Sequence, residues 1–272
     1  MPQPAAAPST AAPAHASPHG GIASGMAVPL SVCPFSSPAP FPFGIEAIDA
    51  RLPWGGLAPA GLNEFKPASP RDAGTALALA LTVAAHAGSA CASPSRRPLL
   101  MVLSGRAGAE HGLPYGPGLI RLGLDPRRLL IAEAPHTADA LWTLEEALRS
   151  GTLAAVLGLM DGGKRTIGLM PARRLVLAAD EGRTPCLLLT GASGEGVSVA
   201  HTRWRVSALP SAPHPLVAAS PGARRCALTL ERCRHGPLDL TWNLEWGEGG
   251  LQLADTDEQR EGMKLSTRQR NS

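Results

Sequence analysis

With 272 residues, the chain is long enough for one domain with tails or for two small domains. Hydrophobic residues make up 44% of it but aromatic residues only 4%, so its core is expected to consist mostly of Leu, Ala and Val. The net charge of +3 is too small to require a nucleic-acid partner, and no apolar run of about 18 residues is present that would span a membrane.

The five cysteines are scattered and form no C-x-x-C motif, so the sequence predicts neither a disulfide framework nor a zinc site. The histidines show no metal-ligand spacing, and no G-x-S-x-G nucleophile turn is present, so neither a metal site nor a catalytic residue is expected. Free thiols fit a reducing cytosol, and the start of the chain lacks the basic and apolar regions of a signal peptide. We therefore predict a cytoplasmic protein.

Residues 1–42 contain no Asp, Glu, Lys or Arg and are dense in Pro, Ala, Ser and Gly. Because such a segment buries too little apolar surface to offset the entropy of ordering it, we predict that it is disordered. A start codon placed too early would explain the segment equally well. The pattern changes at Phe43, where helical spacing begins and ends in a Gly turn at 52–57.

Between residues 43 and 207, short apolar runs alternate with helical patterns. The runs typical of buried strands are 62–65, 99–103, 128–132, 153–157 and 186–189. The patterns typical of helices are 74–86, 115–122, 137–149 and 171–181. Strands and helices that alternate in this way predict an α/β fold with a mostly parallel, doubly wound sheet.

The last part of the chain is predicted to contain strands only, at 202–207, 224–233 and 238–246. A Pro-rich stretch separates the last two strands from the core. The sequence therefore predicts a linker at 208–223, a C-terminal β-hairpin at 224–253 and a disordered polar tail at 254–272.

The junction between the first strand and the following helix is where a phosphate-binding loop would lie. Such a loop needs G-x-x-x-x-G-K-[ST], whose glycines let backbone N–H groups wrap the phosphates and whose Lys and hydroxyl reach phosphate and Mg²⁺. Here the chain runs Lys66-Pro67-Ala68-Ser69-Pro70-Arg71-Asp72-Ala73-Gly74-Thr75, without a Gly-Lys pair and with two prolines that each remove a backbone donor. We predict that this loop binds no nucleotide and that the protein uses no cofactor.

A second segment, Gly158–Thr166, imitates the motif. It fits G-x-x-x-x-G-K as far as Lys164, but Arg165 replaces the metal-binding hydroxyl and Pro171 interrupts the helix that should follow. A Gly-rich surface loop is the simpler interpretation, and residual ATP binding is the alternative.

The order of several short motifs resembles one protein family. These motifs are Gly123–Leu130 (GLDPRRLL), Asp139–Trp142 (DALW), Glu145–Gly151 (EEALRSG), Thr202–Val206 (TRWRV) and Leu230–Arg234 (LERCR). Over roughly residues 43–250, the chain resembles the ImuA family of RecA- and SulA-like accessory proteins of bacterial damage-induced mutagenesis. The resemblance implies a RecA-like core at 43–207.

The resemblance also implies a non-catalytic role in SOS-induced, error-prone translesion synthesis. The partners that it implies are ImuB, an inactive Y-family polymerase homologue, RecA, and indirectly an error-prone C-family polymerase; direct DNA contact is a secondary expectation. The catalytic Glu of RecA falls near Ser104-Gly105-Arg106 in this chain, and a further acidic position falls at about Leu159, with Asp161 two residues late, so we expect no enzyme activity. A SulA-like cell-division inhibitor and a weak RecA-like ATPase are the alternatives.

The candidate partner-binding residues are tryptophans and arginines, which dominate interface energetics. They are Trp242, Trp246, Arg232, Arg234, Arg203 and Arg205. Trp242 and Trp246 share one face of a strand, so they form either an exposed anchor for a protein partner or part of the core. Trp204 faces away from the two arginines beside it, so it is expected in the core, while phosphate contact and simple solvation both stay open for the arginines.

Overall fold

We describe a computed structural model of the chain, covering residues 41–87, 97–160, 167–192, 198–211, 213–214, 216–217, 220–247 and 249–254. The ends predicted to be disordered therefore fall almost entirely outside the described residues. Phe41 corrects the predicted boundary at Phe43, because its side chain is buried and its backbone pairs with Leu57.

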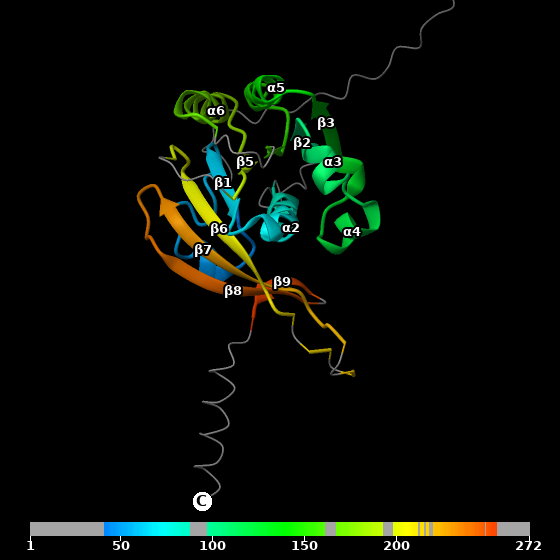
Figure 1. The fold of residues 1–272 in the computed structure, drawn as a ribbon. Helices are drawn as coiled ribbons and strands as arrows, with labels where there is room; N and C mark the ends of the chain where they lie inside the picture. The colour runs from blue at the N-terminus through cyan, green and yellow to red at the C-terminus, as the bar shows by residue number, and fades with distance from the viewer. Residues whose placement is uncertain are drawn as a thin grey trace, which may run out of the picture. The chain divides into compact units, whose positions relative to one another are not determined.

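The described residues form a nine-stranded sheet in the order β3-β2-β4-β5-β1-β6-β7-β8-β9 (Figure 1). The parallel strands are β1 (Leu62–Pro67), β2 (Leu99–Ser104), β3 (Leu129–Ala134), β4 (Ala155–Leu159), β5 (Cys186–Leu189) and β6 (Thr202–Leu209). The antiparallel strands are β7 (Arg225–Cys233), β8 (Leu240–Gly247) and β9 (Gly250–Leu253). The predicted α/β fold with a mostly parallel, doubly wound sheet is confirmed.

Helices cover the parallel part of the sheet on both faces (Figure 1). One face holds α1 (Glu46–Asp49), α2 (Ala73–Ala85), α3 (Ala107–His111) and α4 (Gly116–Arg121), and the other holds α5 (Thr137–Arg149) and α6 (Leu169–Glu181). Short 3-10 turns at Pro70–Asp72 and Pro126–Arg128 precede α2 and β3. Within the described parts of the chain, no helix is long and apolar enough to cross a membrane.

Side chains alternate between two cores, as the period of a strand requires. In β1, Phe65 packs toward α2 whereas Leu62 packs toward α5 and α6. Helix α5 buries Leu144 and Leu148 against the sheet, and Gly158 of β4 leaves the space for it, because a Cβ there would lie 2.9 Å from Leu144 Cδ1. The sheet and its two cores thus fix the positions of α2, α5 and α6.

The C-terminal strands are not a separate unit. Strand β7 pairs with β6, with Trp204 opposite Leu230 and Leu209 opposite Arg225, so the predicted hairpin extends the core sheet. The predicted linker at 208–223 begins inside β6, and the additional strand β9 pairs with β8. The pairing of β8 with β7 places one face of β8 against the main core.

Candidate functional site

The β1–α2 loop, where a nucleotide site would lie, is closed by the chain's own contacts. Ala68 N–H donates to the carbonyl of Val206 at 2.8 Å, and Ser69 N–H donates to Asp72 Oδ2 at 2.9 Å. Pro67 and Pro70 have no N–H to offer. The four residues from Pro67 to Pro70 therefore present no open backbone donor to a phosphate.

The Asp72 carboxylate lies at the start of α2 and joins the loop to β6. Its Oδ2 also accepts from Ser69 Oγ–H at 2.7 Å, and its Oδ1 accepts from Ala208 N–H at 2.9 Å. Partial burial acts to raise the pKa of Asp72, but the hydrogen bonds from Ala208 and Ser69 together bring that pKa below its usual value. A negative charge at this place repels a phosphate instead of attracting one.

Two further positions, near Ser104–Arg106 and at about Leu159, are where the resemblance placed acidic residues of RecA, and the described residues there carry no carboxylate. Ser104 ends β2 with a buried side chain whose Oγ lies 3.4 Å from Thr137 Oγ1, and Arg106 follows as an exposed residue. Leu159 is buried at the end of β4. The residues present at these positions supply neither a general base nor an acidic metal ligand.

The segment that imitates the phosphate motif is described only in part. Gly158 and Leu159 lie inside β4 and not in a loop, and Met160 is buried next to them. Packing explains a glycine at 158, because a Cβ there would come too close to the side chains of Leu144 and Leu188. Residues 161–166, which include Lys164 and Arg165, lie outside the described residues.

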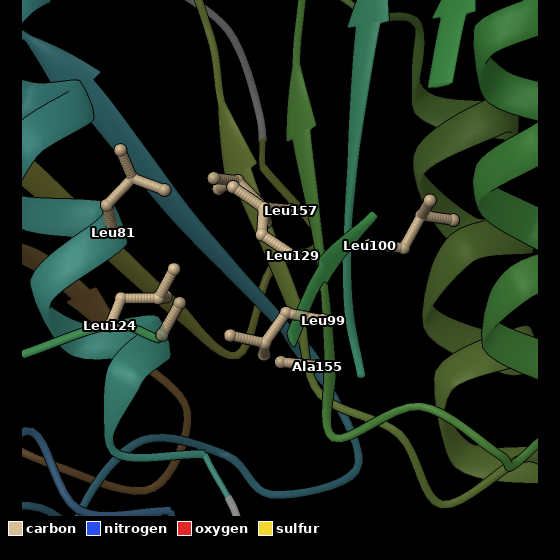
Figure 2. A pocket seen from close by; sticks show the side chains of 8 residues that line it. Leu81, Leu99, Leu100, Leu124, Leu129, Ala155 and Leu157 are labelled. Atoms are coloured by element: carbon tan, nitrogen blue, oxygen red, sulfur yellow. The ribbon is translucent and has the colours of Figure 1, made fainter. Parts of the chain in front are cut away.

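An apolar pocket between α2 and the sheet does not match a nucleotide either (Figure 2). Its lining consists of Leu and Ala side chains, among them Leu81, Leu124 and Leu157. No side chain in this lining can hydrogen-bond a phosphate, a ribose or a base.

Arg203, a candidate partner-binding residue, is held inside the protein by Glu64. The Arg203 Nε–H donates to Glu64 Oε2 at 2.9 Å, and its Nη2–H donates to Glu64 Oε1 at 3.2 Å. Ser198 Oγ–H also donates to Glu64 Oε2, at 2.7 Å. The Arg203 and Glu64 side chains are only 12% and 7% exposed. Glu64 was not among the predicted site residues, although a charged residue inside a buried strand signals a buried partner.

Trp204 is fully buried, as predicted from its position opposite the arginines. Its indole N–H donates to Thr202 Oγ1 at 2.9 Å, and that hydroxyl donates to Asn63 Oδ1 at 2.9 Å. Arg205 lies on the other face of β6, half exposed, 3.2 Å from Glu231 Oε1. Both arginines beside Trp204 therefore have carboxylate partners within the chain.

Trp242 and Trp246 do not form an exposed anchor, which corrects one of the two interpretations of these residues. The Trp242 ring lies 6.1 Å from that of Trp204, and the Trp246 indole N–H donates to Thr82 Oγ1 of α2 at 3.2 Å. Both are partly buried against the core on the inner face of β8. Contact of either tryptophan with a partner stays a prediction. Their contacts with the core already account for their position on β8.

Arg232 and Arg234 cap the turn that leads into β6. Arg232 Nε–H donates to the Ala200 carbonyl at 3.1 Å, and Arg234 reaches the Val199 carbonyl at 3.5 Å. Arg234 also lies 3.4 Å from His201 Nε2. Burial, and next the Arg234 guanidinium, lower the pKa of His201 to about 4, so this histidine is neutral at pH 7.

The sequence is 30% identical to Protein ImuA of Caulobacter vibrioides, in an alignment of 241 residues that covers 79% of this chain and 90% of that protein. The same figures hold for Protein ImuA of a second strain of the species. The chain belongs to the ImuA family. No family model matches it.

A solved structure confirms the fold of this ImuA-family protein. The crystal structure of the RadB recombinase matches it with a TM-score of 0.53 and 17% sequence identity, over 79% of this chain and 100% of the RadB chain. At this identity the likeness concerns the fold alone. The expected RecA-like fold is thereby confirmed, while the closed β1–α2 loop is a property of this chain's own residues.

Proposed function

We propose that this ImuA-family protein is a non-catalytic accessory factor in SOS-induced, error-prone translesion DNA synthesis. It acts through protein–protein contacts with an inactive Y-family polymerase homologue of the ImuB type and with RecA. An error-prone C-family polymerase is reached indirectly through these partners. The protein works in the cytoplasm and uses no nucleotide.

The observation that supports a non-catalytic role most directly is the closed β1–α2 loop. The Ala68 and Ser69 N–H groups are already engaged, and Asp72 puts a carboxylate at the start of α2. An active loop needs free donors and a Lys at this place. A RecA-like scaffold that binds partners without ATP fits these residues better than an ATPase does.

Deletion of the gene, followed by complementation, tests the proposal. We expect the deletion to lower the frequency of ultraviolet-induced mutations, and we expect both the wild-type gene and the Lys66→Ala variant to restore it. Lys164→Ala is the matched variant in the imitating segment and should also restore it. An unchanged mutation frequency would overturn the proposal, and filamentous cells on overproduction would replace it with the SulA-like alternative.

A further inference from the structure

The outer surface of the α5–α6 helix pair carries large apolar side chains that the fold does not use. Trp142 of α5 is 62% exposed, and Met170 and Leu177 of α6 are 65% and 66% exposed. The opposite stripes of the two helices are buried against the sheet through residues such as Leu144 and Leu175. The stability of the helices therefore gives no reason for Trp, Met and Leu on the outside.

Ion pairs between the helices place these side chains close together. Glu145 of α5 pairs with Arg174 of α6 at 2.6 Å, and Arg149 pairs with Glu181 at 3.2 Å, so the helices run parallel and side by side (Figure 1). Trp142 and Met170 each lie about one turn before the first of these pairs. Leu177 lies between the two pairs. We call Trp142, Met170 and Leu177, with their surroundings on both helices, the α5–α6 surface.

The spacing of the α5–α6 surface suits a helix as its occupant. Met170 and Leu177 are seven residues apart on α6, which is two turns or about 10.5 Å along the axis. That is also the distance between positions i and i+7 of a helix laid alongside, the spacing at which an amphipathic helix presents its anchors. The ion pairs between the helices lie beside these apolar side chains, and protein interfaces likewise combine apolar and polar groups.

The charge of the two helices indicates what flanks the apolar face of that occupant. Together α5 and α6 contain five carboxylates, on Asp139, Glu145, Glu146, Asp180 and Glu181, against three guanidiniums, on Arg149, Arg173 and Arg174. The pair of helices thus has a net charge of −2, whereas the whole chain has +3. Opposite charges across an interface steer and orient association.

We propose that the α5–α6 surface docks an amphipathic helix of a partner protein, with an apolar face flanked by Lys or Arg. This inference rests on the proposed function, because an accessory factor without catalysis acts through such a contact. Trp142 is the anchor, since a large aromatic side chain is the typical energetic hot spot of an interface. Met170 adapts its flexible side chain to the partner helix.

A binding titration with designed peptides tests the surface. The probes are two fluorescent helical peptides with the same Leu face, one flanked by Lys and the other by Glu, added to the full chain. We expect saturable binding of the Lys-flanked peptide, with the Kd raised about tenfold or more by Trp142→Ala and by Leu177→Glu. Leu238→Glu is the matched control, because Leu238 is 55% exposed but lies in the β7–β8 connection, and it should leave the Kd unchanged.

Three results would overturn the inference. They are no saturable binding, equal binding by Leu177→Glu and the wild type, and tighter binding of the Glu-flanked peptide. Unfolding midpoints of the variants in urea exclude loss of structure as the cause, since both residues are exposed and should be replaced at little cost. Mutation frequency after gene deletion is measured independently, so failure of the surface and failure of the proposed function are distinguishable.

Discussion

The region around β1, β6 and β8 and the α5–α6 surface both contain a tryptophan, which is covered in the first region and exposed in the second. In the first region, Arg203 is paired with Glu64, Asp72 holds the β1–α2 loop, and Trp246 packs on α2. On the second, Trp142 is 62% exposed and its helix is held in place by other residues. Candidate residues such as Arg203 and Trp246 therefore already have partners within the chain. Trp142 of α5, which was not a candidate, is exposed instead.

The largest expected effect on stability comes from breaking the ion pair between Arg203 and Glu64. Arg203→Met should lower the free energy of unfolding by about 3–5 kcal/mol, because it leaves the Glu64 carboxylate buried without its cation. Adding Glu64→Leu should recover most of that loss, since the charge is then gone. Urea unfolding of both variants measures this. A cost below about 1 kcal/mol for Arg203→Met would mean that this ion pair is more open to water than its contacts indicate.

Replacing the two tryptophans compares the two regions directly. Trp246→Ala should cost about 2–3 kcal/mol of stability, because it removes partly buried contacts and the hydrogen bond to Thr82. Trp142→Ala should stay within about 0.5 kcal/mol of the wild type. The same urea experiment checks both. Equal costs for the two variants would contradict the contrast between a covered and an uncovered tryptophan.

Asp72 provides a pH-dependent test of the loop. Asp72→Asn should cost about 1 kcal/mol at pH 7, because an amide has a single acceptor oxygen for the donors of Ser69 and Ala208. The folded-state pKa of Asp72 is lowered, so its contribution is complete above the unfolded pKa of about 3.9 and is lost as pH falls through the folded value. Unfolding curves from pH 7 downward should therefore converge for the variant and the wild type. A difference that persists in acid would mean that the carboxylate charge is not involved.

Local patterns predicted what depends on neighbours along the chain. Helix α5 has the predicted bounds, and β5 lies where its apolar run stands. The features that the sequence did not predict depend on residues far apart in the chain. Glu64 and Arg203, which form an ion pair, are 139 residues apart. No residue near Trp246 indicates that β7 pairs with β6 and that the Trp246 side of β8 therefore packs against α2. The alternation of side chains along a strand showed that Trp242 and Trp246 share a face, but not which residues cover that face. Strand β9 was missed because its four residues are too few for a periodic signal.

Equilibrium binding of labelled ATP with Mg²⁺ to the full chain tests most directly the claim that this RecA-like scaffold works without a nucleotide. We predict no saturable binding up to about 1 mM ATP, where a binding free energy of only about −4 kcal/mol would already be detected. Lys66→Ala and Lys164→Ala should behave as the wild type does. Micromolar binding that Lys164→Ala abolishes would contradict the account and would identify Gly158–Thr166 as a nucleotide site.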